Sequence, residues 1–566
     1  MKYRNKKAIA TLIVTTLIFT CGATGVQAAP AADLNIVGNV AAAPISGVSL
    51  AVAQANTQTA AEQAALVQNM GVAQIDNYLN VRSEASTDSE VVGIMKNNAV
   101  AEITGAVDGW YQITSGSVSG YVKAEYLAVG NQDLLNSVKT RMAHLEQLVE
   151  QQLLTQEECD SFDFGKNPES IDYAKLYQNR YKILRMACDR FLKQPSDDFF
   201  AFCQENDWWL GNYALFMVIK NMHKGASWLQ WEEKYKSRDF AALDQVWHGQ
   251  HDEIQFYQFQ QYLFFCQWKK LHAYAAQADI QIIGDIPIYV ALDSADAWAE
   301  PQLFQFDEEL NPVAVAGCPP DAFSATGQLW GNPLYRWEYH RQTGYAWWIR
   351  RIAQCLNLYD CIRIDHFRGF DEYYSIPAGD ETAEHGHWEP GPGMSLMQAL
   401  KDALGNVNVI AEDLGFLTDG VRRLLYDSGF PGMKVIQFAF DSREESDYLP
   451  HNYEKNCVVY TGTHDNDTLC GWYKVLDPKD LKLSQKYMNN ANTPKRQIHW
   501  DFIRLALASV ADLCIIPLQD YLGLGSEARI NTPSTLGNNW RWRMNQRGLT
   551  KELADQIREL TTLYGR

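Results

Sequence analysis

The feature that most constrains the fold of this chain is a series of short apolar segments separated by stretches of helix length. Each apolar segment ends in polar residues. This alternation predicts a parallel sheet or barrel, because parallel neighbours need a crossover connection that is usually helical. We find six such segments, at residues 280–289, 361–366, 407–413, 433–440, 457–465 and 513–520. Before them, aromatic-rich segments with helical spacing predict amphipathic helices up to about residue 278.

Three of the predicted strands end in a carboxylate, at Asp365, Glu412 and Asp465. In a (β/α)8 barrel, polar residues at the carboxyl ends of strands converge on one mouth. Each carboxylate alone could be a helix N-cap or a solvated loop residue. Three at matching positions are hard to explain by packing, because a charge at the end of an apolar strand is costly to bury without a partner. We therefore predict that they form one active site.

Cleavage of a glycosidic bond requires two carboxylates in different protonation states. Arg363 lies two residues before Asp365, so both side chains point to the same face of the strand. The neighbouring cation favours an ionised, nucleophilic Asp365. Glu412 has no basic neighbour in the sequence and follows two apolar residues, which suits a carboxyl with a raised pKa. Asp465 and His464 are expected to hydrogen-bond the distorted sugar in the transition state.

Distinctive motifs surround these residues. They are IRIDHFRGF, NVIAEDLG and YTGTHDNDT at the three carboxylates, GDIPIYV from Gly284, the loop at residues 317–333, and PLQD and NWRW near the C-terminus. From about residue 145 to 566 the chain resembles glycoside hydrolase family 77, the 4-α-glucanotransferases or amylomaltases. The resemblance implies a retaining double displacement that transfers segments of α-1,4-glucans and maltooligosaccharides to a 4-hydroxyl acceptor. It also implies that Asp365 is the nucleophile, Glu412 the acid and base, and Asp465 the transition-state stabiliser, with no cofactor or metal.

Six further residues are candidates for substrate binding: Arg363, His366, His464, Asp285, Gln328 and Trp330. The two histidines stand next to the catalytic aspartates, although a satisfied structural role remains open for each. Gln328 and Trp330 lie in the long loop and are candidates for the acceptor side. Trp330 could equally be a packing residue.

The predicted fold class is α/β, a (β/α)8-type barrel at residues 131–566 that lacks its first two strands. A closed barrel of this type needs eight strands, and only six are found. The family resemblance implies an initial segment with two strands, and another kind of sequence stands in its place. An open remnant would expose two apolar edges.

The N-terminal part divides into three segments. Residues 1–29 are predicted to be a signal peptide, with a basic start, an apolar run and small residues near Ala28. Residues 30–70 are predicted to be a low-complexity linker. Residues 71–129 carry short alternating strands, and the pattern LNVRSEAS…GWYQI…GYVKAEYL resembles bacterial Src-homology-3-like modules. Such a small all-β barrel would bind cell-wall peptidoglycan or act as a spacer.

Charge and cysteine content limit the partners and the compartment. The formal net charge of −19 argues against nucleic-acid binding, and no second apolar run of membrane length is present. The predicted location is exported or cell-wall-associated. It is cytoplasmic if the N-terminal fusion is an artefact, and eleven cysteines without a CxxC pair favour a reducing compartment. The alternative function is an exported wall-binding protein with an inactive, truncated glucanotransferase domain.

Overall fold

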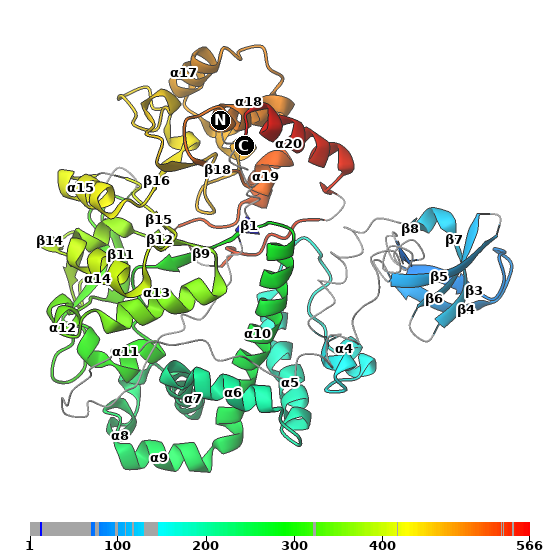
Figure 1. Ribbon diagram of the computed structural model, residues 1–566, viewed down its shortest axis with the longest axis horizontal. Helices are drawn as coiled ribbons and strands as arrows, with labels where there is room; N and C mark the ends of the chain where they lie inside the picture. The colour runs from blue at the N-terminus through cyan, green and yellow to red at the C-terminus, as the bar shows by residue number, and fades with distance from the viewer. Residues whose placement is uncertain are drawn as a thin grey trace, which may run out of the picture. The chain divides into compact units, whose positions relative to one another are not determined.

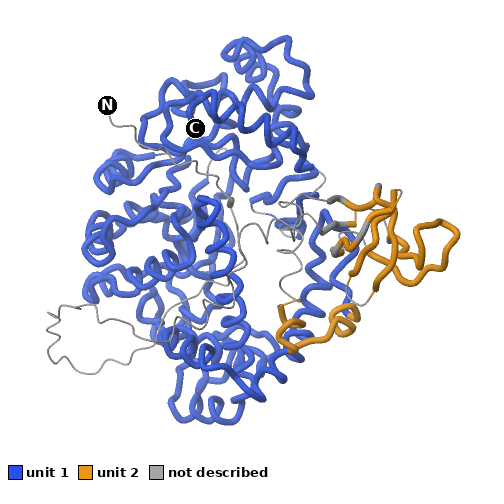
Figure 2. The backbone as a smooth tube through the Cα atoms, turned by 45° about the vertical axis from the view of Figure 1, so that its right-hand side comes forward, with its two compact units in different colours: residues 1–27, 162–566 blue, residues 28–161 orange. Residues whose placement is uncertain are grey.

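The computed structural model describes residues 12–13, 70–73, 78–96, 100–107, 109–115, 118–129, 145, 147–320, 324–415, 417–533, 535, 537–545 and 548–566. The chain divides into two compact units, shown in Figure 2. One comprises residues 1–27 and 162–566, and the other residues 28–161. The predicted signal peptide, apart from Leu12–Ile13, and the predicted linker before Met70 lie outside the described residues.

The smaller unit contains an antiparallel sheet with the strand order β4-β3-β7-β6-β5-β2-β8. Its elements are β2 (Met70–Ala73), β3 (Tyr78–Arg82), β4 (Val91–Lys96), β5 (Val100–Val107), β6 (Trp110–Ser115), β7 (Val118–Lys123), the 3-10 turn η1 (Ala124–Tyr126) and β8 (Leu127–Val129), followed by α4 (Gln156–Ser161). Successive side chains of a strand point to opposite faces of the sheet. Val81, Ile113 and Val122 point inward and are fully buried in one cluster. These strands form the small all-β module expected from the sequence.

The larger unit begins with a helical layer. It consists of α5 (Tyr173–Phe191), α6 (Asp197–Glu205), α7 (Asp207–Met222), η2 (Trp228–Gln230), α8 (Glu233–Lys236), α9 (Phe240–Gly249) and α10 (His251–Gln277). Asp172, Ser196 and Asp239 cap three of these helices by accepting a backbone N–H three residues ahead. The long helix α10 packs against α7, and Trp209, Phe265 and Trp268 belong to the apolar cluster beneath them.

Six parallel strands follow, as the sequence predicts. They are β9 (Ile282–Pro287), β12 (Cys361–Asp365), β15 (Val409–Ala411), β16 (Gly432–Val435), β17 (Cys457–Tyr460) and β18 (Leu513–Ile515). One sheet has the order β1-β9-β12-β15, where β1 (Leu12–Ile13) pairs in parallel with β9, and a second has the order β16-β17-β18. The first of these sheets crosses the centre of Figure 1. In the described part of the chain, β18 pairs with β17 alone.

The two parallel sheets share an apolar interior. The amide of Ala411 donates to the carbonyl of Pro431 at 2.9 Å, which joins the end of β15 to the residue before β16. A single buried cluster contains side chains from five of the six strands: Ile283, Ile410, Met433, Val435, Val458, Tyr460 and Ile515. The strands are shorter than the predicted segments, because the chain turns into η5 (Ile436–Phe438) after β16 and α19 (Leu518–Tyr521) after β18.

A separate antiparallel sheet with the order β11-β10-β13-β14 lies between β9 and α14 in the chain. Its strands are β10 (Ala314–Cys318), β11 (Gln328–Pro333), β13 (Glu372–Pro377) and β14 (His387–Pro390). The remaining elements are α11 (Ala295–Ala299), η3 (Pro301–Leu303), α12 (Trp337–Gln342), α13 (Ala346–Leu358), η4 (Phe367–Phe370), α14 (Met394–Leu404), α15 (Asp419–Ser428), η6 (Pro450–Asn452), α16 (Leu469–Val475), α17 (Pro478–Met488), η7 (Lys495–Gln497), α18 (Ile498–Leu507), η8 (Ser526–Ala528) and α20 (Lys551–Leu563).

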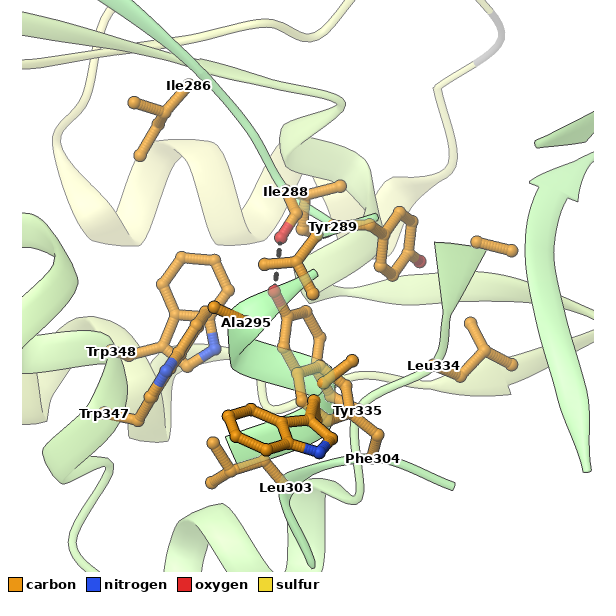
Figure 3. Packing of buried hydrophobic residues seen from close by; sticks show 14 of the residues in the cluster. Ile286, Ile288, Tyr289, Ala295, Leu303, Phe304, Leu334, Tyr335, Trp347 and Trp348 are labelled. Atoms are coloured by element: carbon orange, nitrogen blue, oxygen red, sulfur yellow. Dashed lines mark hydrogen bonds between the residues drawn. The ribbon is translucent and has the colours of Figure 1, made fainter. Parts of the chain in front are cut away.

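An aromatic core supports the carboxyl end of β9 (Figure 3). The hydroxyl of Tyr335 donates to the carbonyl of Ile288 at 2.8 Å, and both residues are buried. Arg351 donates to the carbonyls of Ile288 and Pro287 at 3.0 and 2.5 Å. Trp347 and Trp348 pack around Tyr335, with ring centroids 5.6 and 5.5 Å away. The core thus fixes the backbone where β9 leaves the sheet.

Candidate active site

Polar side chains gather at the carboxyl ends of β9, β12, β15 and β17. Asp285 lies on β9 directly opposite Arg363 on β12, and Ile364 of β12 lies opposite Ala411 of β15. Parallel register therefore sets Asp365 and Glu412 at the same end of adjacent strands. Asp465 follows β17 in a loop that begins at Thr461.

Arg363 joins two carboxylates. Its Nη1 donates to both oxygens of Asp285 at 2.7 Å, and its Nη2 lies 3.0 Å from Oδ1 of Asp365. The planar guanidinium suits this arrangement, because its donors are fixed in a fork. Burial by itself would lower the pKa of Arg363, but attraction to Asp285 and Asp365 outweighs it and holds the pKa above the ordinary value. Arg363 is therefore a permanent cation beside Asp365, whose side chain is 46% exposed.

Glu412 is held by two backbone amides. Oε2 accepts a hydrogen bond from His366 N at 2.8 Å, and Oε1 accepts one from Leu414 N at 2.7 Å. Burial and the negative charge of Asp365 raise the pKa of Glu412 to about 7, although Arg363 and the two amides oppose the rise. The sequence predicts the raised pKa, but only the fold brings the opposing charge of Arg363 close. A carboxyl that titrates near pH 7 can both donate and accept a proton.

Asp465 and His464 form the other side of the site. Oδ2 of Asp465 lies 3.4 Å from Nε2 of His464, whose Nδ1 lies 4.0 Å from Oδ2 of Asp285. His464 therefore lies between Asp285 and Asp465. Oδ1 of Asp465 accepts a hydrogen bond from Nδ2 of Asn531 at 2.6 Å.

His366 directly follows Asp365 and adopts the left-handed backbone conformation, with φ 55°. Strained backbone of this kind at a bulky residue is typical of functional sites. Burial lowers the pKa of His366 to about 4, so the ring is neutral at pH 7. Its Nε2 has no hydrogen-bond partner among the described residues. A neutral imidazole with a free nitrogen can bind a sugar hydroxyl.

Gln328 and Trp330 reach the site from β11. The Trp330 ring meets the His366 ring edge-on at a centroid distance of 4.8 Å, and its Nε1 donates to Oε1 of Gln328 at 3.1 Å. Trp330 is 36% exposed, so part of the ring is open to a ligand. A continuous series of contacts and strand pairings thus links all nine predicted residues.

Sequence reasoning missed the contribution of Arg529 and Asn531 and gave Trp540 no role. Nη2 of Arg529 donates to the carbonyl of Asp465 at 2.7 Å, and Trp540 lies 5.2 Å from the His464 ring. Arg529 and Asn531 lie 64 and 66 positions after Asp465, to which each donates a hydrogen bond. No local pattern in the sequence links them to it.

Two further observations concern metal-ligating groups and membrane-length helices. Among the described residues, His, Cys, Asp and Glu side chains form no group of three or more that could hold a metal ion. In that same part of the chain, no helix is long and apolar enough to cross a membrane.

The site defines a class of protein: an α/β enzyme that acts on glycosidic bonds through paired carboxylates.

Comparisons with known proteins give the family. The sequence profile of glycoside hydrolase family 77, described as 4-alpha-glucanotransferase, matches residues 117–550, and that of the bacterial SH3 domain matches residues 77–128. The 4-alpha-glucanotransferase of Clostridium butyricum is 45% identical over 424 residues, which cover 75% of this chain and 87% of that protein. The one from Thermus thermophilus is 44% identical over 399 residues, covering 69% and 80%.

A solved structure agrees with the profile. Amylomaltase from Streptococcus agalactiae in complex with acarbose has a TM-score of 0.72 and 38% identity, and the match covers 75% of this chain and 86% of that one. The chain belongs to glycoside hydrolase family 77, the 4-α-glucanotransferases or amylomaltases, and carries an N-terminal bacterial SH3 domain. The family and the module predicted from the sequence are both confirmed.

Proposed function

We propose that this 4-α-glucanotransferase transfers segments of α-1,4-glucans to the 4-hydroxyl of an acceptor by a retaining double displacement. The observation that carries the proposal is the contrast between two carboxylates at adjacent strand ends. Asp365 lies 3.0 Å from a buried guanidinium, whereas the pKa of Glu412 is raised to about 7 by burial and by Asp365. One group is thus suited to attack and the other to proton transfer.

In the first half of the reaction, an oxygen of the Asp365 carboxylate attacks the anomeric carbon of the donor glucan. The glycosidic bond breaks as Glu412 gives its proton to the leaving oxygen, which leaves with the reducing-end fragment. In the second half, Glu412 takes the proton of the acceptor 4-hydroxyl, whose oxygen attacks the anomeric carbon and displaces Asp365. Both carboxyl groups return to their starting states, and two inversions retain the configuration.

The surrounding residues bind and orient the sugar. Asp465 and His464 hydrogen-bond the distorted ring opposite the nucleophile, and Asp285 holds Arg363 in place while it faces His464. The neutral His366 ring offers Nε2 to a hydroxyl. Gln328 and the exposed part of Trp330 line the acceptor side, where an aromatic face can stack on the apolar face of a glucose ring.

Incubation with maltotriose tests the proposal, with products resolved by chromatography and mass spectrometry. We expect glucose together with a ladder of longer maltooligosaccharides. Asp365→Asn and Glu412→Gln should abolish the ladder, whereas the exposed carboxylates of α14 and α12 provide matched controls, Asp402→Asn and Glu338→Gln, that should keep it. Glucose without longer products would indicate an α-glucan hydrolase instead.

We further infer that the six parallel strands are those of a (β/α)8-type barrel that lacks its first two strands. Support comes from their consecutive order, their parallel pairing and the apolar cluster that their inner faces share. Amide hydrogen exchange of the intact chain, resolved by peptide, tests this. The backbone amides of β18, at one end of this series, should exchange faster than those of β12, which is paired on both sides.

We also propose that residues 1–29 direct export and that the bacterial SH3 domain binds peptidoglycan. The basic and apolar character of the N-terminal residues and the fold of the module support this pair of roles. Fractionation of expressing cells, with the mass of the mature chain, tests export. A pull-down on purified peptidoglycan with and without residues 71–129 tests wall binding. An unprocessed cytoplasmic chain would contradict the first role, and equal retention of both forms would contradict the second.

A further inference from the structure

A segment near the C-terminus holds the loop after β17 that carries Asp465. The side-chain amide of Asn531 donates to Oδ1 of Asp465 at 2.6 Å. The backbone N–H of the same residue, Asn531, donates to the carbonyl of His464 at 3.1 Å. One residue therefore binds the carboxylate of Asp465 and the peptide unit that precedes it.

Arg529 adds a second connection between the same two segments. Its Nε donates to the carbonyl of Asn531 at 2.8 Å, and its Nη2 donates to the carbonyl of Asp465 at 2.7 Å. A guanidinium is planar and its donors have fixed directions, so it holds the two carbonyls at a set separation. Asn531 is thereby placed relative to the backbone of Asp465 as well as to its carboxylate.

The C-terminal segment itself is anchored on both sides. The amide of Trp540 donates to the carbonyl of Ile530 at 2.7 Å, and its ring lies 5.2 Å from that of His464. The hydroxyl of Tyr173 donates to the carbonyl of Trp540 at 2.7 Å, and Ile171 N donates to the carbonyl of Arg541 at the same distance. The first residue of α5 and the residues before it therefore support this C-terminal segment from outside the site.

We propose that Asn531 and Arg529 are positioning residues for Asp465, an inference that rests on the proposed function. Asn531 occupies Oδ1 and so fixes the rotation of the carboxylate. Oδ2, next to His464, is left to hydrogen-bond the sugar as it approaches the transition state. Because this contact matters most in the transition state, its misplacement lowers kcat more than it raises KM.

Steady-state kinetics with maltotriose, read as glucose release, test the proposal. We expect Asn531→Ala to lower kcat on the order of 10- to 100-fold while KM changes by less than about 3-fold. Arg529→Ala should lower kcat similarly, and the double variant should be no slower than the worse single variant, because both act through one carboxylate. Asn545→Ala, an exposed asparagine of the same segment that bonds to Glu169, is the matched control and should keep wild-type kcat.

Asn531→Asp gives a readout that a purely structural role would not move. The new carboxyl has nearly the same shape, but once ionised it cannot donate to Asp465 and repels it. Its kcat relative to wild type should therefore recover as pH falls and the new carboxyl regains a proton to donate. Circular dichroism melting curves identify any variant that does not fold.

The outcomes separate the two proposals. Normal transfer by the wild type with unchanged kcat in folded Asn531→Ala overturns this inference alone. The inference is also overturned if the kcat losses of the two single variants multiply in the double variant. The same holds if kcat of Asn531→Asp varies with pH in parallel with that of the wild type. A wild-type chain that makes no longer maltooligosaccharides overturns the proposed function and the inference with it.

Discussion

At the scale of single residues, the site depends on how one guanidinium is shared. Arg363 is 6% exposed and contacts the largely buried Asp285 and the half-exposed Asp365, so two of the three charges are removed from water together. A buried charge is tolerated only when it is paired and hydrogen-bonded. Asp285 thus orients Arg363, and Arg363 in turn places a positive charge beside Asp365 and opposes the raised pKa of Glu412.

Arg363→Lys should lower kcat for maltotriose disproportionation by about 10²-fold, even though the positive charge remains. In the structure Nη1 donates to Asp285 while Nη2 faces Asp365, and the single nitrogen of an ammonium group cannot occupy both positions. Glucose-release kinetics measure the effect. Arg341→Lys on α12, where the arginine pairs with Glu338 at the surface, is the control and should be unaffected. Comparable kcat values for the two variants would show that the fork geometry is unimportant.

The pH dependence follows from Glu412, whose pKa is raised to about 7 in the folded protein by burial and by Asp365. Its proton is present below that pH and lost above it, so the general acid disappears as pH rises through about 7. We expect kcat/KM for maltotriose to fall toward tenfold per pH unit on the alkaline side. A rate profile from pH 5 to 9 checks this. A constant kcat/KM up to pH 9 would contradict the assignment.

At the scale of elements, the antiparallel sheet brings an aromatic residue to a site built on parallel strands. β11 carries Gln328 and Trp330 toward His366, while β14 carries the equally exposed Trp388 elsewhere in the same sheet. Trp388 contacts Tyr374 and Arg368 instead. The sheet thus separates one tryptophan beside His366 from another in a different environment.

Trp330→Ala should raise KM for an added glucose acceptor about 2- to 10-fold, because the stacking of the indole ring on the glucose ring is lost. The ratio of transfer to hydrolysis should fall in parallel, since water then competes better. Product analysis with labelled glucose measures both quantities. Trp330→Phe should retain most of the acceptor affinity, and Trp388→Ala, the matched tryptophan, should behave as wild type. Equal effects of the two alanine variants would argue against an acceptor role for Trp330.

At the scale of the whole molecule, the stability of the larger unit depends on sheet edges. In the described residues, β18 has one hydrogen-bonded neighbour, and β9 has β12 and the two-residue β1, which belongs to the segment proposed to direct export. Unpaired strand edges favour association with other chains. Sixteen of the seventeen tryptophans follow residue 161, the exception being Trp110, so fluorescence reports almost entirely on this unit.

We therefore expect the tryptophan fluorescence of the intact chain to show a broad thermal transition with a midpoint below about 45 °C, accompanied by light scattering. The physical reason is that, among the residues that the structure describes, β18 pairs with β17 alone. The fluorescence of Trp110 contributes little, and far-UV circular dichroism provides a second probe. A sharp, reversible transition between about 45 and 65 °C, the ordinary range for such domains, would contradict this prediction.

Much of this architecture is predictable from local sequence. The six parallel strands, the helical layer before them and the β module follow from hydrophobic periodicity and turn residues, which act over a few positions. Strand ends are less predictable, because β16 and β18 stop where the chain turns into η5 and α19. The antiparallel sheet β11-β10-β13-β14 escapes prediction, since the pairing of β10 with β11 and β13 depends on partners that the sequence does not name.

The sequence by itself determined the family. It also singled out the three carboxylates as candidates and placed Arg363 beside Asp365, because these residues lie within short motifs at single strands. Only the tertiary structure decided that Asp285 completes the Arg363 fork, that His366 meets Trp330, and that Asn531 binds Asp465. These contacts join residues 78, 36 and 66 positions apart. A side chain's chemistry is local, but its orientation and protonation depend on neighbours that folding alone brings within reach.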